Sequence, residues 1–380
     1  MDFTFSDEQL QFRDALRRYL DKEYAFDARQ KIVASAAGVD ANHWRAFAEL
    51  GLLALPVPEA QGGFDGGAVD MLVVLQELGR ALVVEPLWAT AVGIEALRLG
   101  AQQGSTLSRE LLERAGCGDL HLAVAFNEPD ARYDLFDLHT TASGDGDRIT
   151  LAGTKSMVRH GAQADCWIVP ARTGGDAGDE IALFIVANDA ANVRITDYRT
   201  IDGQRAATLV FDGTPATRLD GRGTGAATFE QIADYATFLL CAEALGALDA
   251  LNRATVEYTK QRQQFGVPIA RFQVLQHRMV DMLIHTEQAR SITYLAAARY
   301  ASDDAVTRAQ AISAAKARVG QAARFVGQQA VQLHGGMGVT NELPVAHWFK
   351  RLSIIETTLG DVDHHVARFA ALPAFSVTEV

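Results

Sequence analysis

The sequence predicts an α+β protein in which a small barrel or sandwich of strands separates two helical regions. Three observations lead to this class. Helical patterns fill residues 1–119 and 223–380, short β-prone runs fill residues 120–222, and the two textures do not alternate. A nucleotide-binding fold would alternate strands with helices, and the chain has neither a GxGxxG nor a P-loop motif. We therefore expect an N-terminal helical domain (1–119), a middle β domain (120–222) and a C-terminal four-helix bundle (223–380).

The composition is that of an ordinary globular protein. Its 380 residues are 48% hydrophobic and 22% charged, and the formal net charge is -12. The acidic balance argues against nucleic-acid binding, which requires basic patches. No apolar run approaches the roughly 18 residues of a membrane span, and the acidic segment Met1 to Leu10 is unlike a signal peptide. We expect a cytoplasmic protein that binds neither nucleic acid nor membranes.

Cysteine and histidine spacing gives no sign of a metal site. Cys117, Cys166 and Cys241 are far apart in the sequence and lack paired spacing, which argues against both a zinc site and a disulfide framework. His364 and His365 are adjacent, so on a helix their side chains point in different directions. We predict no bound metal.

The first helix has a complete start signal. Ser6 can cap it, Gln9 can complete a capping box, and Phe12, Leu16 and Leu20 then recur every four residues as one buried stripe. Further helices are expected at residues 44–53 and 69–84.

The middle and C-terminal regions differ in periodicity. Short β-prone runs separated by Gly, Asp and Asn turns predict strands at 148–151, 166–169, 181–186 and 208–211. Long helical patterns without proline predict helices at 232–262, 276–300 and 306–333, followed by a last helix at 363–372. Gly335 and Gly336 end the third of these long patterns.

Two segments of the C-terminal region are specific. The first reads Arg262-Gln-Gln-Phe265-Gly266, followed by Pro268-Ile269 and Phe272-Gln273, and the second is Gln332-Leu-His-Gly335-Gly336-Met-Gly338. At this separation and in this helical context the chain resembles the acyl-CoA dehydrogenase family over essentially its whole length. Within the family the resemblance is to the small subunit of pimeloyl-CoA dehydrogenase, through residues 241–246, 334–336 and 349–352.

The resemblance implies a flavoprotein oxidoreductase of fatty acid metabolism and β-oxidation. In the family a carboxylate removes the α-proton of an acyl-CoA thioester, the β-hydride moves to FAD, and an electron-transfer flavoprotein reoxidises the flavin. A homotetramer or heterotetramer is implied as well.

The resemblance also implies which residues contact FAD. In the family the arginine and phenylalanine of the first segment hold the adenosine-diphosphate part of FAD bound to the neighbouring subunit. A guanidinium can fork onto pyrophosphate oxygens, and glycines let the backbone approach a phosphate. Alone, Arg262 could equally be a helix-capping residue and the two glycines only a helix stop. The implied cofactor contacts are Arg262, Phe265, Gln273, Gln332, Gly335, Gly336 and Asn127.

The sequence departs from the family at the catalytic base. Of the two positions that carry the glutamate in family members, one aligns with Leu359 and the other, ten residues before Gly246, with Ala236. Neither side chain can accept a proton, as a general base must. A relocated carboxylate would have to be Glu243, Glu356 or Asp361, which the sequence also allows to be structural. We therefore assign no catalytic residue.

The strand domain departs too. Where the family often has Trp-Ile-Thr-Asn-Gly beside the flavin, this chain has Met157-Val-Arg159-His160-Gly, and Asn127 replaces the threonine before Glu-Pro. Arg159 and His160 are interpreted either as surface residues that fill a vacated pocket or as residues with a new role.

Three hypotheses follow. The leading one is a small subunit that completes the FAD site of a catalytic large subunit acting on a dicarboxylic or bulky acyl-CoA. The alternatives are a homotetrameric dehydrogenase with a relocated base and a flavin-free scaffold or acyl-CoA-binding subunit.

Overall fold

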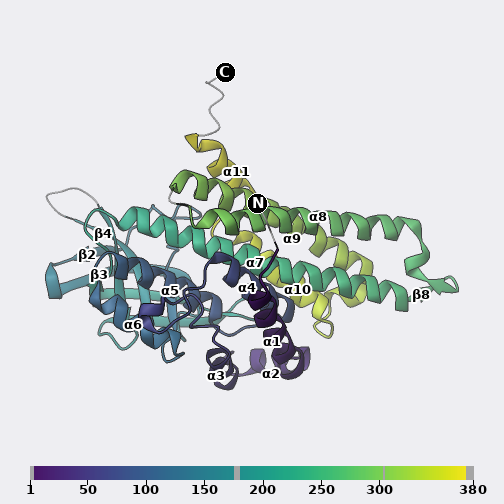
Figure 1. Cartoon of the computed structure of the whole chain (residues 1–380), viewed down its shortest axis with the longest axis horizontal. Helices are drawn as coiled ribbons and strands as arrows, with labels where there is room; N and C mark the ends of the chain where they lie inside the picture. The colour runs from purple at the N-terminus through teal and green to yellow at the C-terminus, as the bar shows by residue number, and fades with distance from the viewer. Residues whose placement is uncertain (1–3, 175–179, 303, 374–380) are drawn as a thin grey trace. The chain divides into compact units, whose positions relative to one another are not determined.

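The computed structural model describes residues 4–174, 180–302 and 304–373 (Figure 1). The chain divides into two compact units. One comprises Met1–Gln30, Ala68–Val83 and Thr237–Val380, and the other Lys31–Gly67 and Val84–Ala236. The predicted α+β class is confirmed, with helices before and after a region of strands. The three-domain division at residues 119 and 222 stays a prediction.

The N-terminal third is helical. Its helices are α1 (Asp7–Glu23), α2 (Phe26–Ala34), α3 (Ala41–Glu49), α4 (Ala68–Ala81), α5 (Leu87–Gln102) and α6 (Thr106–Gly116). The predicted capping box is present, because Ser6 Oγ accepts from the Gln9 backbone N–H at 3.2 Å and Gln9 Oε1 accepts from the Ser6 N–H at 3.0 Å. Leu16 and Leu20 are each 1% exposed, which confirms the predicted stripe.

The strands form a closed barrel. They are β1 (Leu122–Val124), β2 (Thr141–Ser143), β3 (Ile149–Arg159), β4 (Cys166–Thr173), β5 (Glu180–Ala187), β6 (Val193–Arg199) and β7 (Arg205–Arg218). Pairing runs β4–β2–β3–β7–β5 and back to β4, while β1 adds to β4 and β6 adds to β7. The interior contains Leu151, Trp167, Phe184, Leu209 and Phe211.

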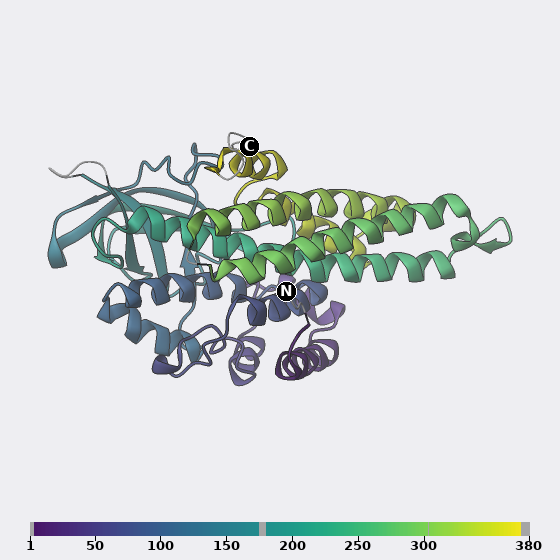
Figure 2. The same ribbon diagram turned by 45° about the horizontal axis from the view of Figure 1, so that its top comes forward.

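The C-terminal region is built on long helices. They are α7 (Gly225–Gln261), α8 (Gln273–Tyr300), α9 (Ala305–His334), α10 (Pro344–Thr357) and α11 (Val362–Ala371). Figures 1 and 2 show α7, α8 and α9 side by side, with the hairpin of β8 (Gln263–Gln264) and β9 (Val267–Pro268) beyond their end. Helix α10 was not predicted, although Pro344 at its first turn is a common start signal.

Close helix packing explains one glycine of the 241–246 segment. A Cβ on Gly246 would lie 1.8 Å from the Gln76 carbonyl oxygen of α4, and a Cβ on Gly79 would lie 1.9 Å from the Glu243 carbonyl oxygen of α7. The two backbones can therefore touch only because both positions are glycine.

Among the described residues, no helix combines the length and apolarity needed to cross a membrane. The three cysteines are free thiols.

Candidate functional site

The hairpin that follows α7 presents Phe265 outward. Phe265 (φ 54°) and Gly266 (φ 78°) form the two-residue connection between β8 and β9, and positive φ at both positions is the requirement of a type I′ turn. Positive φ is uncommon for a bulky residue and is worth a functional explanation. Phe265 is 91% exposed, and its ring lies edge-to-face with that of Phe272, with ring centroids 6.1 Å apart.

Arg262 lies at the base of this hairpin. Its backbone is fixed, because its N–H donates to the Tyr258 carbonyl and its carbonyl accepts from the Ile269 N–H, both at 2.8 Å. Its side chain is exposed and has no hydrogen bond or ion pair with any residue that the structure describes. The guanidinium therefore keeps its full set of donors for another molecule.

The glycine turn lies at the same end of the bundle. Helix α9 ends where Gly335 adopts φ 60°, and a Cβ added at Gly335 or Gly336 would meet no atom within 4 Å. The Tyr258 hydroxyl donates to the His334 carbonyl at 3.2 Å and the two rings stack at 4.3 Å, which ties this turn to the end of α7.

The remaining predicted contacts divide between the units. Gln273 is the first residue of α8 and Gln332 lies in the last turn of α9, and both are exposed at the hairpin end. Six of the seven predicted residues therefore share one end of the bundle. Asn127 belongs to the other unit, where its carbonyl accepts from the Ser156 N–H at 2.9 Å.

Two side chains of the strand segment that the resemblance places beside the flavin ring, Arg159 and His160, are buried. Arg159 is 7% exposed, donates to Gln204 Oε1 at 3.0 Å and places its guanidinium carbon 5.6 Å from the centre of the Trp88 ring. His160 is 3% exposed. The interpretation of these two as surface residues is wrong, because Trp88 and Gln204 give the arginine a buried partner set that the sequence pattern did not reveal. Met157 remains 43% exposed.

Leu359, the first position at which the resemblance implies a base, lies in a turn with positive φ. Leu359 is 7% exposed and has φ 57°, followed by Gly360 at φ 106°. Lys316 Nζ donates to the Glu356 and Gly360 carbonyls at 2.9 and 2.5 Å. His365 Nε2 lies 2.9 Å from the Leu359 carbonyl oxygen, and its pKa is lowered to about 2, mainly by burial, so this nitrogen is the donor of a neutral ring.

None of the three candidate replacement carboxylates is free to act as a base. Glu243 accepts from Arg351 Nε at 2.6 Å and Nη2 at 2.5 Å, with both side chains buried. Glu356 accepts from Arg324 Nη2 at 2.7 Å. A buried bidentate pair of this kind occupies both carboxylate oxygens with hydrogen bonds.

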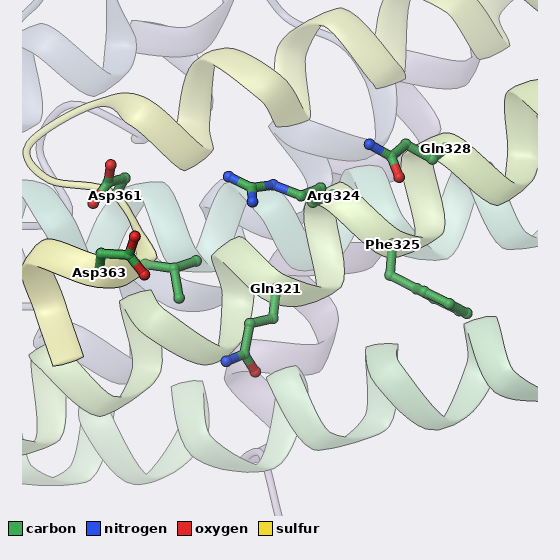
Figure 3. Close-up of a pocket in the computed structure, with 7 residues that line it drawn as sticks. Gln321, Arg324, Phe325, Gln328, Asp361 and Asp363 are labelled. Atoms are coloured by element: carbon green, nitrogen blue, oxygen red, sulfur yellow. The ribbon is translucent and has the colours of Figure 1, made fainter.

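Asp361 caps α11 by accepting from the His364 N–H at 2.9 Å. Figure 3 shows Asp361 and Asp363 on one side of a small polar cavity of about 270 Å³, with the guanidinium of Arg324 directed toward them. Negative charge at a helix N-terminus has a structural explanation of its own.

The second position for a base is inert as well. Ala236 is fully buried, and its carbonyl accepts from Trp88 Nε1 at 3.2 Å. Lys316, His365 and Arg351 were missed from the sequence. Their only signal is a charged or polar residue within an apolar helical pattern, which does not identify the partner.

Comparison with known proteins agrees with this geometry. Sequence models of the acyl-CoA dehydrogenase N-terminal, middle and C-terminal domains match residues 6–103, 123–214 and 223–371. The acyl-CoA dehydrogenase IpdE2 of Mycolicibacterium smegmatis is 30% identical over 369 residues, covering 96% of this chain and 99% of the relative.

Solved structures agree in fold. The Tcur3481-Tcur3483 steroid ACAD variant matches with a TM-score of 0.89 at 29% identity, and the ChsE4-ChsE5 complex from Mycobacterium tuberculosis with 0.87 at 27%. Each match covers 97% of this chain and 98% of the chain in the solved structure. The chain therefore belongs to the acyl-CoA dehydrogenase family, FAD-dependent oxidoreductases that act on CH–CH bonds.

Proposed function

We propose that this chain is the small, non-catalytic subunit of a heterotetrameric acyl-CoA dehydrogenase and completes the FAD site of a large catalytic subunit. The observation that carries the proposal is a contrast within one unit. The hairpin end has an exposed arginine, Arg262, whose side chain has no hydrogen bond or ion pair with any described residue. In contrast, the three candidate replacement carboxylates, Glu243, Glu356 and Asp361, are each occupied by an arginine or a helix end.

The residues at the hairpin end fit the adenine end of FAD. Arg262 offers a guanidinium whose fork matches pyrophosphate oxygens. Gly335 and Gly336 leave space where any other residue would have a side chain, and the ring of Phe265 can pack on the apolar part of the nucleotide. Gln273 and Gln332 supply amide groups at the same end. When bound, FAD supplies the acceptor for the hydride that leaves the acyl β-carbon.

The ring side does not fit in the same way. The guanidinium of Arg159 lies over the Trp88 ring, at the position where the family places a threonine beside the flavin. Asn127 is the single cofactor contact that we predicted in that unit. The α-proton of an acyl-CoA also needs a general base within hydrogen-bond reach. We therefore assign proton removal to the partner subunit.

A homologous large subunit is the partner that we propose. The ChsE4-ChsE5 complex and the Tcur3481-Tcur3483 protein each carry two chain names, which supports a pairing of unlike chains. Helix α8 also exposes three apolar side chains on one face, Val280, Leu283 and Ile284, as associating surfaces do. Electron-transfer flavoprotein is the proposed electron acceptor, and a cytoplasmic location stays a prediction.

The substrate class that we propose is a bulky or dicarboxylic acyl-CoA. The resemblance to the small subunit of pimeloyl-CoA dehydrogenase favours a dicarboxylic chain, and a relative described as a steroid ACAD favours a bulky one. Pimeloyl-CoA and a steroid side-chain CoA thioester are the two substrates to compare.

The test is co-expression with a family member that has glutamate at one of the two base positions. Flavin content per tetramer and bleaching of the flavin absorbance by acyl-CoA are measured for this chain alone, for the large subunit alone and for the complex. We expect both to be highest in the complex and bleaching to be absent from this chain alone.

Two results would contradict the proposal. If the complex had no more flavin or activity than the large subunit alone, this chain would not complete the FAD site. Bleaching of the isolated, yellow chain would instead show a relocated base in a homotetramer, and a complex that stays colourless would support a flavin-free scaffold.

A further inference from the structure

A second cavity lies within the unit that contains the bundle, outside the set of residues at the hairpin end. It has a volume of about 460 Å³ and is walled by α1, α4, α7, α8 and α10. We propose that this cavity binds a small organic anion that carries an aromatic ring next to a phosphate or carboxylate group. The inference does not depend on the proposed function.

The charge of the wall favours an anion. Five arginines and three carboxylates line the cavity, in a chain whose net charge is -12. Guanidinium groups present planar forks that match phosphate and carboxylate oxygens. The arginines are Arg13, Arg17, Arg80, Arg253 and Arg290.

Most of the lining carboxylates are already held by these arginines. Glu77 accepts from Arg17 at 2.5 and 3.0 Å and from Arg80 Nε at 2.8 Å. Asp249 accepts from Arg290 Nη2 at 2.6 Å. Arg253 differs, because its exposed side chain has no hydrogen bond or salt bridge with any residue in the described ranges. A ligand anion would find Arg253 without a hydrogen bond to any described residue, and Glu77 and Asp249 already occupied.

Three aromatic side chains, Phe5, Tyr294 and Trp348, also line the cavity. Trp348 is fixed at the wall because its Nε1 donates to the Arg80 carbonyl at 3.2 Å. Tyr294 packs edge-on against Phe5, with ring centroids 5.5 Å apart. Aromatic faces beside guanidinium groups suit a ligand with both a planar ring and a charge.

Two buried donors of α4 also lack acceptors. Gln76 Nε2 and Arg80 Nη2 belong to lining residues and have no hydrogen-bond partner among the described residues. Unsatisfied buried polar groups are rare in native proteins and call for a partner such as water, an ion or a ligand. Both atoms are donors, so the missing partner is an acceptor. The cavity volume is also within the range of about 300–1,000 Å³ that small-molecule sites have.

The test uses fluorinated fragments that contain no adenine, so that binding at an FAD or CoA site does not interfere. The dissociation constants of 4-fluorophenyl phosphate and 4-fluorobenzoate are measured by ¹⁹F NMR on the full chain, with inorganic phosphate and 4-fluorophenol as competitors. We expect saturable binding of at least one charged fragment. Inorganic phosphate and 4-fluorophenol should each bind at least about tenfold more weakly than that fragment, because each makes only part of the contacts. The phosphate and carboxylate fragments decide which anion the site prefers.

Variants locate the binding. Arg253→Gln removes the guanidinium without breaking a salt bridge, and we expect it to weaken the bound fragment by about tenfold or more. Arg299→Gln, on an exposed arginine of α8 outside the lining, is the matched control and should leave the dissociation constant unchanged. The proposal is overturned if neither charged fragment saturates, or if the two variants weaken binding equally.

Discussion

The hairpin end of the bundle and the turn between α10 and α11 belong to the same unit but have opposite properties. At the hairpin end, Arg262 and Phe265 are exposed, and the arginine side chain has no hydrogen bond or ion pair with any described residue. At the turn, Leu359 is buried, and Lys316 and His365 hold the surrounding carbonyls. The difference teaches that one unit can present exposed groups to another molecule at one end and, elsewhere, hold a buried turn by hydrogen bonds to its backbone. The four predictions below test each side of that contrast.

The largest effect is expected from breaking the pair between Glu243 and Arg351. Arg351→Met leaves a buried carboxylate without its partner, which should cost about 3–5 kcal/mol in the free energy of unfolding. Urea denaturation measures this change. The double variant Glu243→Gln/Arg351→Met removes both charges and should recover a large part of the loss. If the single variant is as stable as wild type, Glu243 is not structural and becomes a candidate base again.

The next effect concerns the hairpin end. Arg262→Gln in the complex should weaken FAD retention by about tenfold to a hundredfold, because charge-assisted hydrogen bonds contribute about 1.5–3 kcal/mol. Its unfolding free energy should not change, since the side chain has no partner in the described residues. Flavin released on dilution is measured by fluorescence, with Arg299→Gln as control. Unchanged FAD retention would remove Arg262 from the cofactor site.

A smaller effect is expected in the barrel. Arg159→Thr restores the family residue but removes a buried hydrogen bond to Gln204 and the contact with Trp88. The loss of stability should be about 2 kcal/mol, without acyl-CoA-dependent bleaching of the isolated chain. If acyl-CoA bleached the flavin of this single variant, Arg159 alone would have prevented the reaction, and a base would be present in this chain.

The smallest effect is a pH dependence at the α10–α11 turn. Burial lowers the pKa of His365 to about 2, while in the unfolded chain it is about 6.5. Between these values the unfolded state binds the additional proton, so this histidine lowers stability by about 1.4 kcal/mol for each pH unit below 6.5. Denaturation at pH 7.5 and 5.5 should show a smaller difference for His365→Gln than for wild type. His277→Gln, an exposed position on α8, should behave as wild type.

Much of the fold was predictable because it depends on local patterns. The capping box at Ser6, the stripe through Leu16 and Leu20 and the long helices follow from spacing alone. Individual boundaries were less accurate, since α7 begins at Gly225 rather than 232 and α8 at Gln273 rather than 276. Closure of the barrel was left open between barrel and sandwich, because it depends on pairings distant in sequence.

The candidate site, which stays a prediction, could be proposed from the sequence only where it consists of contiguous motifs. The segments around Arg262 and Gly335 read as motifs, and the structure brings them to one end of the bundle. The burial of Arg159 required Trp88 and Gln204, which are 71 and 45 positions away in the sequence. Such partners have no local signal, which is why surface placement was a reasonable but wrong expectation.

The turn at Leu359 also has a consequence for substitution at that position. Lys316 and His365 bind backbone carbonyls, so they do not depend on which side chain occupies position 359. The backbone of this turn is therefore held by the same two side chains whichever residue occupies position 359, so the geometry of the turn and the chemistry of that residue can vary independently.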